Sequence, residues 1–580
     1  MASLLPTSSV SDRVTFKVKV DGNEINADFR ISGLEIRNEI NRVPFAIIEL
    51  IDGDPANRDF PASNDDNFKP GAEVEIELGY DDNTESVFEG IIIKHKIKTG
   101  RKKSRLTIEC KDKAVFMTQV RKSAYYYESL DSDVIETIIR DHGLSGDVEA
   151  SSVSHKEIVK YNVTDWDFMV TRAELNSMIV IAGEGNITVK KPELSGGSVF
   201  SANYGENIYD FEAEMDARTQ VSGTKGKSWD YANQEILEAD GEEPRMANLG
   251  NVDGSELASS MNDQTYELVH SGKVEDQELA EWASARFLKS RLARIRGRVR
   301  VNGVAALKPG VLITLAGVGD RFSGDAFVSG VAHNIVKGKW FTDVQFGMSP
   351  NWFPEETEDV VDQPATGIIP GIGGLHVGVV TALEGDPDGE NRIQVKIPLI
   401  NNEEDGLWAR IAKLDAGDNR GVIFLPEIDD EVIVGFINDD PRNPVILGQL
   451  HSSAKPSPIE PSDDNHEKGI ITRGDLRVVF DDDKSSIEVS TPNGNKILLS
   501  EDDGSILVED ENGNTVKMSS DGVDVESAGD INIKASGDVN IEGTNVNVSA
   551  QSQLVCEGTT GAELSSGGQT VIKGALVAIN

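Results

Sequence analysis

Apolar and polar residues alternate through much of the chain, and this period of two predicts β-strands. The run VTFKVKV at residues 14–20 alternates strictly and ends at an Asp-Gly-Asn turn. Residues 70–110 continue the pattern with three predicted strands, and residues 298–350 resume it after a helical region. Two groups of short strands separated by turn residues predict two β-barrels in the first 353 residues.

Three stretches interrupt this alternation and carry the boundary residues of helices. The predicted helices are residues 134–142 after Asp131 or Ser132, residues 166–176 after Thr164 or Asp165, and residues 278–296 after Glu275-Asp276. The last of them ends in an arginine-rich segment with Arg286, Arg291, Arg294 and Arg296. These cations either complement the helix macrodipole or face an acidic neighbouring subunit, and the sequence leaves both explanations open.

A change of composition separates this region from a second group of strands. Residues 354–374 combine acidic residues, proline and glycine without periodicity, which is typical of a linker. Five predicted strands follow: HVGVVTAL, RIQVKIPL, LWARIAKL, GVIFLP and EVIVGFIN. Short strands at this spacing predict an oligonucleotide-binding (OB) type barrel, and a proline-rich segment closes it.

The end of the chain carries the most regular pattern. Between residues 478 and 548, two apolar residues flanking a polar one recur, first every nine or ten residues and later every seven or eight. The later units read SAGDINIK and ASGDVNIE, a Gly-Asp turn followed by a short strand. Each strand has one face to bury. We name residues 470–580 the C-terminal rod.

The length of this repeat limits how the C-terminal rod can be built. A single-chain solenoid takes about 20 residues to surround a core, and one short repeat supplies about one side of that perimeter. Three copies that each supply one side would close it, so the repeat predicts an intertwined triple-stranded β-helix in a homotrimer. A meander of hairpins within one chain is the alternative.

Composition excludes several classes of partner. The 99 acidic and 56 basic residues give a formal net charge of -43, which repels nucleic acid and anionic membranes. The two cysteines, Cys110 and Cys556, indicate no disulfide framework. The sequence also lacks the pattern of a signal peptide and the apolar length of a membrane span. We therefore expect a protein made in the bacterial cytoplasm without a signal peptide.

Catalytic and metal-binding signatures are absent from the sequence. The eight histidines form no pair at ligand spacing, and no Gly-x-Ser-x-Gly motif occurs. Gly226-Lys227-Ser228 resembles the end of a phosphate-binding loop, but Val221 stands where that motif needs glycine. Acidic runs such as residues 481–483 fall between strands, where turn residues belong. The sequence indicates no catalytic residue, no metal site and no cofactor.

Several segments carry a family resemblance. The most specific is LWARIAKLDAGDNRGVIFLPEIDDEVIVGFINDDPRNPVILGQLHSS at residues 407–453, in which Asn-Asp-Asp-Pro replaces the Gly-Asp-Pro that is usual. Upstream, DWDFMVTRAE at residues 165–174 and LKPGVLITLAGVGDRFSGDAFVSGVAHNI at residues 307–335 are similar to a phage tail hub. Together they resemble the valine-glycine repeat protein G (VgrG) family, the fused hub-and-spike proteins of type VI secretion systems, phage tails and extracellular injection particles.

The resemblance implies a mechanical role. In this family a trimeric hub caps the inner tube, and sheath contraction drives the tube and spike through a target envelope. The implied partners are two further copies of the chain, an inner tube protein, baseplate proteins, a PAAR-type tip protein and effector cargo. The implied location is an injection particle that is secreted, released or driven into the target cell.

The apolar end of the chain, GALVAIN, resembles the platform on which a tip protein docks. The candidate residues for this contact are Leu576, Val577, Ala578, Ile579 and Asn580. An ordinary last turn of the C-terminal rod is the alternative.

We therefore predict a mainly β, non-enzymatic protein. Its predicted parts are a hub at 1–353, a linker at 354–374, an OB-fold spike base at 375–453, a linker at 454–469 and a β-helical spike at 470–580. The competing function is a β-helical tailspike enzyme or adhesin that acts on surface polysaccharide. All six tryptophans precede the C-terminal rod, which argues against an aromatic sugar-binding groove there.

Overall fold

The computed structural model describes residues 13–100 and 103–579. It divides into two compact units, which we name the hub unit and the spike unit. The hub unit runs to Gly374 and includes Phe436–Asn443, and the spike unit holds Leu375–Gly435 and the chain from Pro444 onward. The mainly β fold predicted from the alternating pattern is confirmed. In the described ranges, no helix is long and apolar enough to cross a membrane.

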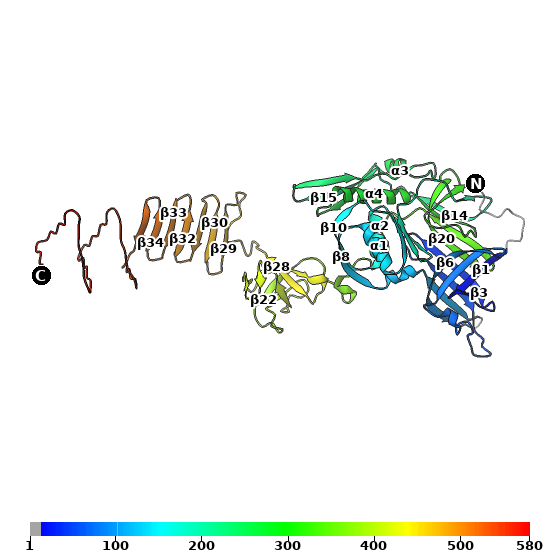
Figure 1. Ribbon diagram of the computed structural model, residues 1–580, viewed down its shortest axis with the longest axis horizontal. Coiled ribbons are helices and arrows are strands. Elements are labelled where there is room, and N and C mark those ends of the chain that lie inside the picture. The colour runs from blue at the N-terminus through cyan, green and yellow to red at the C-terminus, as the bar shows by residue number, and fades with distance from the viewer. Residues whose placement is uncertain (1–12, 101–102, 580) are drawn as a thin grey trace. The chain divides into compact units, whose positions relative to one another are not determined.

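Thirteen strands of the described hub unit belong to one sheet (Figure 1). The strands of its first half are β1 (Val14–Val20), β2 (Asn23–Glu24), β3 (Arg30–Glu39), β4 (Phe45–Ile51), β5 (Glu73–Tyr80), β6 (Asn83–Lys98) and β7 (Arg105–Lys111). Those of its second half are β13 (Phe200–Asn203), β14 (Ile208–Met215), β18 (Ile295–Asn302), β19 (Leu312–Ala316), β20 (Gly324–Val336) and β21 (Lys339–Phe346). The two predicted groups of strands are therefore both present.

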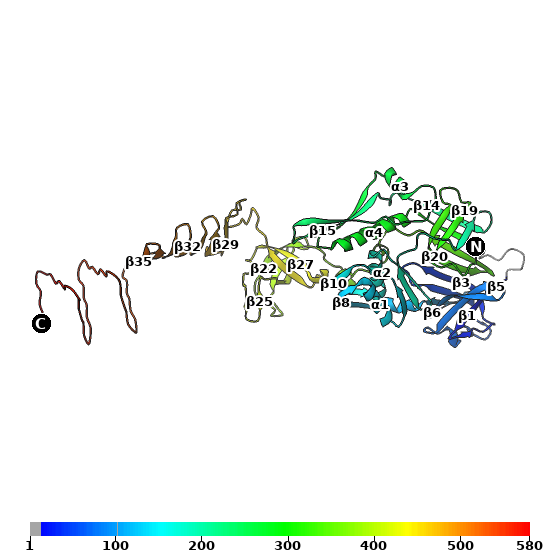
Figure 2. The same ribbon diagram turned by 45° about the horizontal axis from the view of Figure 1, so that its top comes forward.

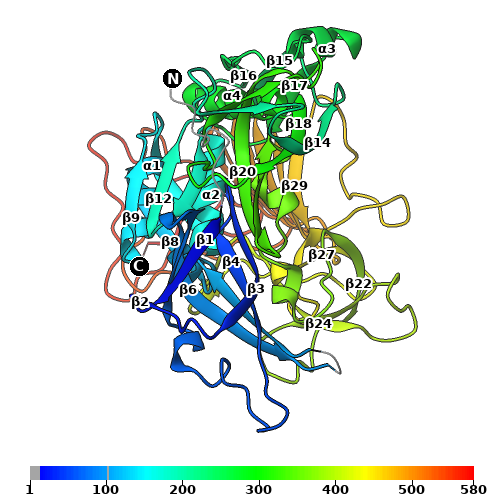
Figure 3. The same cartoon turned by 90° about the vertical axis from the view of Figure 1, so that its right-hand side faces the viewer.

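The two halves are joined because β20 pairs antiparallel with β3, as Figure 3 shows for the green and dark blue strands. Each half keeps a core of its own. In the first half Ile48, Ile76 and Ile108 are fully buried. In the second half Val299 and Val344 are fully buried. The hub thus has two packed strand groups within one continuous hydrogen-bonded sheet, and its described strands do not form the two separate β-barrels that the sequence predicted.

A helical subdomain fills the segment between the two halves. It contains α1 (Asp131–Asp141) and α2 (Asp165–Leu175), the pair β8 (Arg121–Leu130) and β10 (Ser154–Thr164), and the sheet β9 (Ser145–Val148), β11 (Ile179–Gly183) and β12 (Asn186–Lys190). Helix α2 begins as predicted, because the Thr164 side chain accepts a hydrogen bond from the backbone N–H of Asp167. The prediction that Asp131 or Ser132 caps α1 is wrong, because both lie inside the helix and Leu130 is the N-cap.

Asp131 has another role, because it binds three side chains from distant parts of this subdomain. Its Oδ1 accepts from Arg172 Nε at 2.5 Å, and its Oδ2 accepts from Asn176 Nδ2 at 2.8 Å. His155 Nε2 lies 3.2 Å from the same Oδ2. Burial would raise the pKa of Asp131, but these hydrogen bonds and the charge of Arg172 lower it to about 2. The carboxylate therefore ties α1 to α2 and β10.

Another sheet of the hub unit lies in the segment of the chain that contains α3 and α4. Its strands are β15 (Gly223–Asp230), β16 (Glu235–Asp240) and β17 (Thr265–His270), and its helices are α3 (Gly254–Ser260) and α4 (Asp276–Leu292). Helix α4 packs on β15 and β16. It ends four residues before the predicted end, because Ile295 already begins β18 and pairs with Met215. A short α5 (Phe353–Glu356) follows the second half of the hub sheet.

The spike unit opens with a closed five-stranded barrel. Its strands are β22 (His376–Ala382), β23 (Ile393–Lys396), β24 (Leu407–Ile411), β27 (Glu431–Phe436) and β28 (Pro444–Gln449). The predicted OB-type barrel is therefore present. One predicted strand is wrong: most of GVIFLP forms no strand, and only Gly421 takes part in the small hairpin of β25 (Ala416–Gly417) and β26 (Arg420–Gly421). The fifth barrel strand is β28 instead.

Candidate assembly surface of the C-terminal rod

Seven consecutive strands form an antiparallel sheet at the start of the C-terminal rod (Figure 2). They are β29 (Glu467–Ile471), β30 (Arg477–Asp481), β31 (Ser486–Ser490), β32 (Lys496–Ser500), β33 (Ser505–Glu509), β34 (Thr515–Ser519) and β35 (Gly522–Glu526). Each strand pairs with the next one along the chain. The second and fourth residues of each five-residue strand share one face, because side chains alternate across a sheet.

The register aligns the apolar pairs of the sequence in two continuous rows on that face. One row is Phe480, Ile487, Leu499, Ile506, Met518 and Val523, and the other is Val478, Val489, Ile497, Val508, Val516 and Val525. We name these twelve residues the apolar face. The other face is mostly polar, with residues such as Glu488, Lys517 and Asp524.

The apolar face is left half exposed by its own chain. Ile497 is 44% exposed and Leu499 is 41% exposed, although both lie in the middle of the sheet. A sheet with one apolar face reaches a stable fold only when that face packs against another layer. The described part of the chain leaves this face without a covering layer.

The chain beyond β35 is exposed more completely. From Ala528 to Ile579 every residue is exposed, and the described residues there form no strand (Figure 1). The repeating apolar residues are the most informative, since Ile531 is 56% exposed and Ile541 is 72% exposed. Within 527–579, the described backbone N–H and C=O groups make no backbone–backbone hydrogen bond to one another. Buried backbone groups of folded proteins are almost always paired, and this exposed segment leaves its own groups unpaired with one another.

The hairpin interpretation of the repeat applies only to the first part of the C-terminal rod. The hairpin meander, which the sequence offered as the alternative, describes β29–β35. The segment 527–579 does not continue that meander. The predicted change of period near residue 523 coincides with the end of pairing at Glu526.

Carboxylates of the C-terminal rod hold its turns. Asp510 Oδ1 accepts hydrogen bonds from the backbone N–H groups of Asn512 and Asn514 at 2.9 and 2.8 Å. The side chain and backbone of Asn514 lower the pKa of Asp510 to about 2. Asp481 likewise accepts from the backbone N–H of Lys484 at 3.1 Å. Both acids accept hydrogen bonds from the turn that follows them, although Asp481 is itself the last residue of β30.

The four described residues of the predicted tip contact are exposed, and exposure alone does not test whether they bind a tip protein. Leu576 and Ile579 are each 87% exposed and Val577 is 47% exposed. Ala578 is also exposed, and Asn580 lies outside the described residues. Tip binding by these five residues stays a prediction.

Two arginines near the end of α4 are buried and bind groups of their own chain. Arg291 is 5% exposed, and its Nε lies 2.6 Å from Glu243 Oε1. Arg294 is 8% exposed, and its Nη2 donates to the carbonyl of Leu249 at 2.8 Å. The hypothesis that these two side chains face a neighbouring subunit is wrong. Arg291 does lie in the last turn of α4, as expected for a cation that complements the helix dipole.

Comparisons with known proteins identify similar chains for both units. Residues 10–337 match the family model of the Alg8 N-terminal domain. Residues 376–451 match the model of the type VI secretion system/phage-baseplate injector OB domain. The matches cover much of the hub region and the closed barrel, respectively.

Individual relatives are more distant. The chain is 22% identical over 496 residues to the type VI secretion system spike protein VgrG1b of Pseudomonas aeruginosa, which covers 79% of this chain and 63% of that protein. The chain thus spans less than two thirds of the length of this relative. A solved structure of the c3393 protein of E. coli, described as a component of the type VI secretion system, covers 75% of this chain and 100% of that chain at 13% identity, with a TM-score of 0.38. A tail protein from Neisseria meningitidis covers 59% of this chain and 99% of that chain at 13% identity, with a TM-score of 0.44.

Proposed function

We propose a function for this chain, which belongs to the Alg8 N-terminal domain family and is a VgrG-type spike protein. Three copies of the chain form the hub and spike of a contractile injection system. The observation that carries the proposal is the half-exposed apolar face, followed by a segment with no backbone pairing of its own. Both features need further chains. The spike relatives and the injector OB domain indicate the machine in which those chains assemble.

Three copies fit the geometry of the repeat. Each strand of β30–β35 offers two inward apolar residues and is only five residues long, which is enough for one side of a closed prism. Rotation about a threefold axis brings three equivalent apolar faces together around a common core. The same threefold axis allows the residues beyond Glu526 to form an intertwined β-helix, in which each strand pairs with strands of the other two copies.

The hub and the tip have separate partners in this proposal. The hub unit caps the inner tube protein and contacts baseplate proteins, while the exposed apolar end at Leu576–Ile579 receives a PAAR-type tip protein. Effector cargo travels with the assembly. The protein is made in the cytoplasm and leaves it as part of the injection particle. The hub, linker and spike boundaries predicted from the sequence remain part of the proposal.

The role is mechanical, without catalytic turnover. Asp481 and Asp510 of the C-terminal rod accept hydrogen bonds from its turns, and the low pKa of Asp510 does not suit a general acid. Polar side chains dominate the outer face, and the tryptophans that such an enzyme would use for sugar stacking precede the rod. A polysaccharide-binding adhesin or enzyme is therefore the weaker candidate.

Labelling in assembled particles tests the function. Isolated particles that carry an affinity tag on this chain should bind a gold-labelled antibody at one end of the tube, and particles made without the chain should lack that terminal density. Label spread along the tube would contradict a spike role. Release of sugar fragments from bacterial polysaccharide by the purified chain would favour the enzyme instead.

The tip contact has its own test. A truncation after Gly574 removes the apolar end and leaves the preceding repeats intact. We expect the truncated trimer to lose a tip protein in pull-down while its molar mass still corresponds to three chains. Recovery of the tip protein with the truncated chain would contradict docking on residues 576–580.

A further inference from the structure

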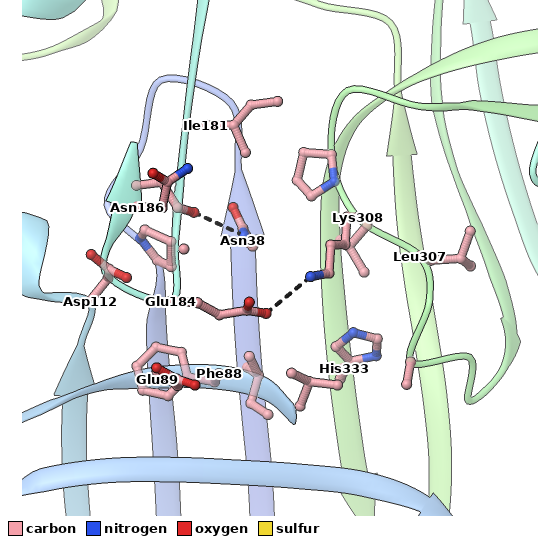
Figure 4. Close-up of a pocket in the computed structure, with 18 of the residues that line it drawn as sticks. Asn38, Phe88, Glu89, Asp112, Ile181, Glu184, Asn186, Leu307, Lys308 and His333 are labelled. Carbon is pink, nitrogen blue, oxygen red and sulfur yellow. Dashed lines mark hydrogen bonds and ion pairs between the residues drawn. The ribbon is translucent and has the colours of Figure 1, made fainter. Parts of the chain in front are cut away.

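The closed barrel of the spike unit exposes large apolar side chains, whereas charged groups of the hub cavity pair with each other. In that cavity of about 280 Å³, Lys308 Nζ lies 3.0 Å from Glu184 Oε1 (Figure 4). The segment between β24 and β27 instead leaves its apolar side chains uncovered within one chain. We name residues 412–428 the barrel arm. Its exposed apolar residues are Leu414, Ile423, Phe424, Leu425 and Ile428.

The barrel arm is a hairpin that packs little against its own barrel. The backbone N–H of Val422 donates to the carbonyl of Asp415 at 3.0 Å, and β25 pairs with β26 at the end of the arm (Figure 2). Leu414 is 94% exposed and Ile423 is 72% exposed. The structure describes the whole arm, and Pro426 is its only buried residue. An isolated two-stranded hairpin is marginally stable in water, so the arm needs a surface on which to pack.

A second apolar surface lies on the outside of the same barrel. Leu375 is 65% exposed and Leu447 is 51% exposed. They meet over β27, because a methyl group added to Gly435 would lie 3.4 Å from Leu375 Cδ2 and 3.6 Å from Leu447 Cδ1. Val377 is the register partner of Ile433 and shares its face of the sheet. We name Leu375, Val377, Ile433 and Leu447 the barrel wall.

The symmetry of the proposed trimer requires two different surfaces on each copy. A threefold axis relates the copies head to tail, so every contact joins one surface of a copy to another surface of the next copy. A twofold contact would instead need one self-complementary patch. The barrel arm and the barrel wall are two different apolar surfaces on one small domain, as head-to-tail packing requires.

Ion pairs hold the base of the barrel arm beside the start of the C-terminal rod. Glu427 Oε2 lies 2.6 Å from Nη1 of Arg473, which is located between β29 and β30. Asp430, just after the arm, has its Oδ1 2.9 Å from Lys455 Nζ. The apolar face of the rod begins at Val478 in β30. A contact between neighbouring barrels would therefore continue the surface through which the rods associate in the proposed trimer.

We propose that the barrel arm of each copy packs on the barrel wall of the next copy around the threefold axis. This inference rests on the trimer proposed above and adds a contact outside the C-terminal rod. Phe424 anchors the contact, because aromatic side chains contribute most where an interface is fully covered. Three equivalent contacts close a ring of barrels at the base of the spike.

Cross-linking of the full-length protein tests this arrangement. Phe424→Cys and Leu447→Cys are combined in Cys556→Ser protein, because Cys556 is exposed and Cys110 is buried. A short bismaleimide should join most chains into a covalent species of three chains on a denaturing gel. The control combines Phe424→Cys with Gln394→Cys on β23, which is not adjacent to β27 in the barrel, and should leave single chains.

A charge on the barrel arm gives an independent readout. Phe424 is 56% exposed within one chain, so Phe424→Asp should leave the barrel folded. In the trimer the same substitution places a carboxylate in each covered contact, and dissociation on dilution should begin at a concentration about tenfold higher or more. Gln394→Glu adds the same charge on β23 and should leave the dissociation unchanged.

The outcomes separate this contact from the function proposed above. A trimer that gives no covalent species of three chains, or in which Phe424→Asp dissociates like the wild type, overturns the arm contact alone. A monomer at every concentration overturns both. Protection of the arm thiol only in complete particles, without cross-linking in the isolated trimer, indicates that a baseplate protein covers the arm and also overturns the proposal.

Discussion

Replacing one residue of the apolar face measures how strongly the chains associate. Ile497 lies in the middle of the face and keeps 44% of its surface exposed within one chain. Complete burial of an isoleucine side chain is worth about 1.5–3 kcal/mol, so burial of the remaining part contributes about 0.7–1.3 kcal/mol for each copy. A trimer contains three such side chains. Ile497→Ala should therefore weaken trimer formation by about 2–4 kcal/mol, which is on the order of 30- to 1000-fold.

Ile497→Asp places three carboxylates at the same level of the C-terminal rod and should abolish association, because buried like charges are strongly unfavourable. Lys517→Ala is the matched control on the polar face of the same sheet and should leave association unchanged. Sedimentation over a range of concentrations gives the association constant of each variant. Association of Ile497→Asp that equals the wild type would refute the argument that the apolar face is the contact surface.

Three further predictions concern the hub. Asp131 has a pKa of about 2 against an ordinary value of 3.8. Its ionised form therefore adds about 2 kcal/mol to the free energy of unfolding above pH 4, and this contribution is lost as the pH falls toward 2. Asp131→Asn should flatten this part of a curve of stability against pH and lower the stability at pH 7 by about 3 kcal/mol. Thr164→Ala should lower the stability of the hub by about 1 kcal/mol in denaturant unfolding, because it removes the hydrogen bond to the backbone of Asp167. Burial raises the pKa of the Cys110 thiol to about 12, so in a Cys556→Ser variant a thiol reagent should react only after unfolding.

Each of these outcomes has a control within the chain. Thr164→Ser keeps the capping oxygen and should restore the stability that Thr164→Ala loses. A stability curve of Asp131→Asn that falls between pH 4 and 2 as steeply as the wild type would exclude Asp131 as the source of that dependence. Rapid labelling of folded Cys556→Ser protein would show that Cys110 is accessible.

The sequence predicted strands well where the alternation was strict and where turn residues bounded it. β1 and the strands of the C-terminal rod follow this pattern, because each has one apolar and one mostly polar side. The same rule failed for GVIFLP, where Ile423 is 72% exposed. An apolar run does not reveal whether partner strands exist on both sides. The short helix α3 was missed, although Asp253 and Glu256 at its start form a recognisable capping pattern.

Contacts between side chains that lie far apart in the sequence could not be predicted. Asp131 was expected to cap a helix because it precedes an apolar run, yet its partners Arg172 and Asn176 come from α2 and its C-cap. A subunit contact was one of the two explanations open for Arg291 and Arg294, yet Glu243 and a backbone carbonyl of the same chain engage them.

The solution molar mass of the full-length protein tests the central claim most directly. Light scattering combined with size-exclusion chromatography should give three times the chain mass of 62.8 kDa, unchanged on moderate dilution. That result follows if the apolar face and the segment beyond Glu526 are completed by other copies. A stable monomer of 62.8 kDa would contradict the account.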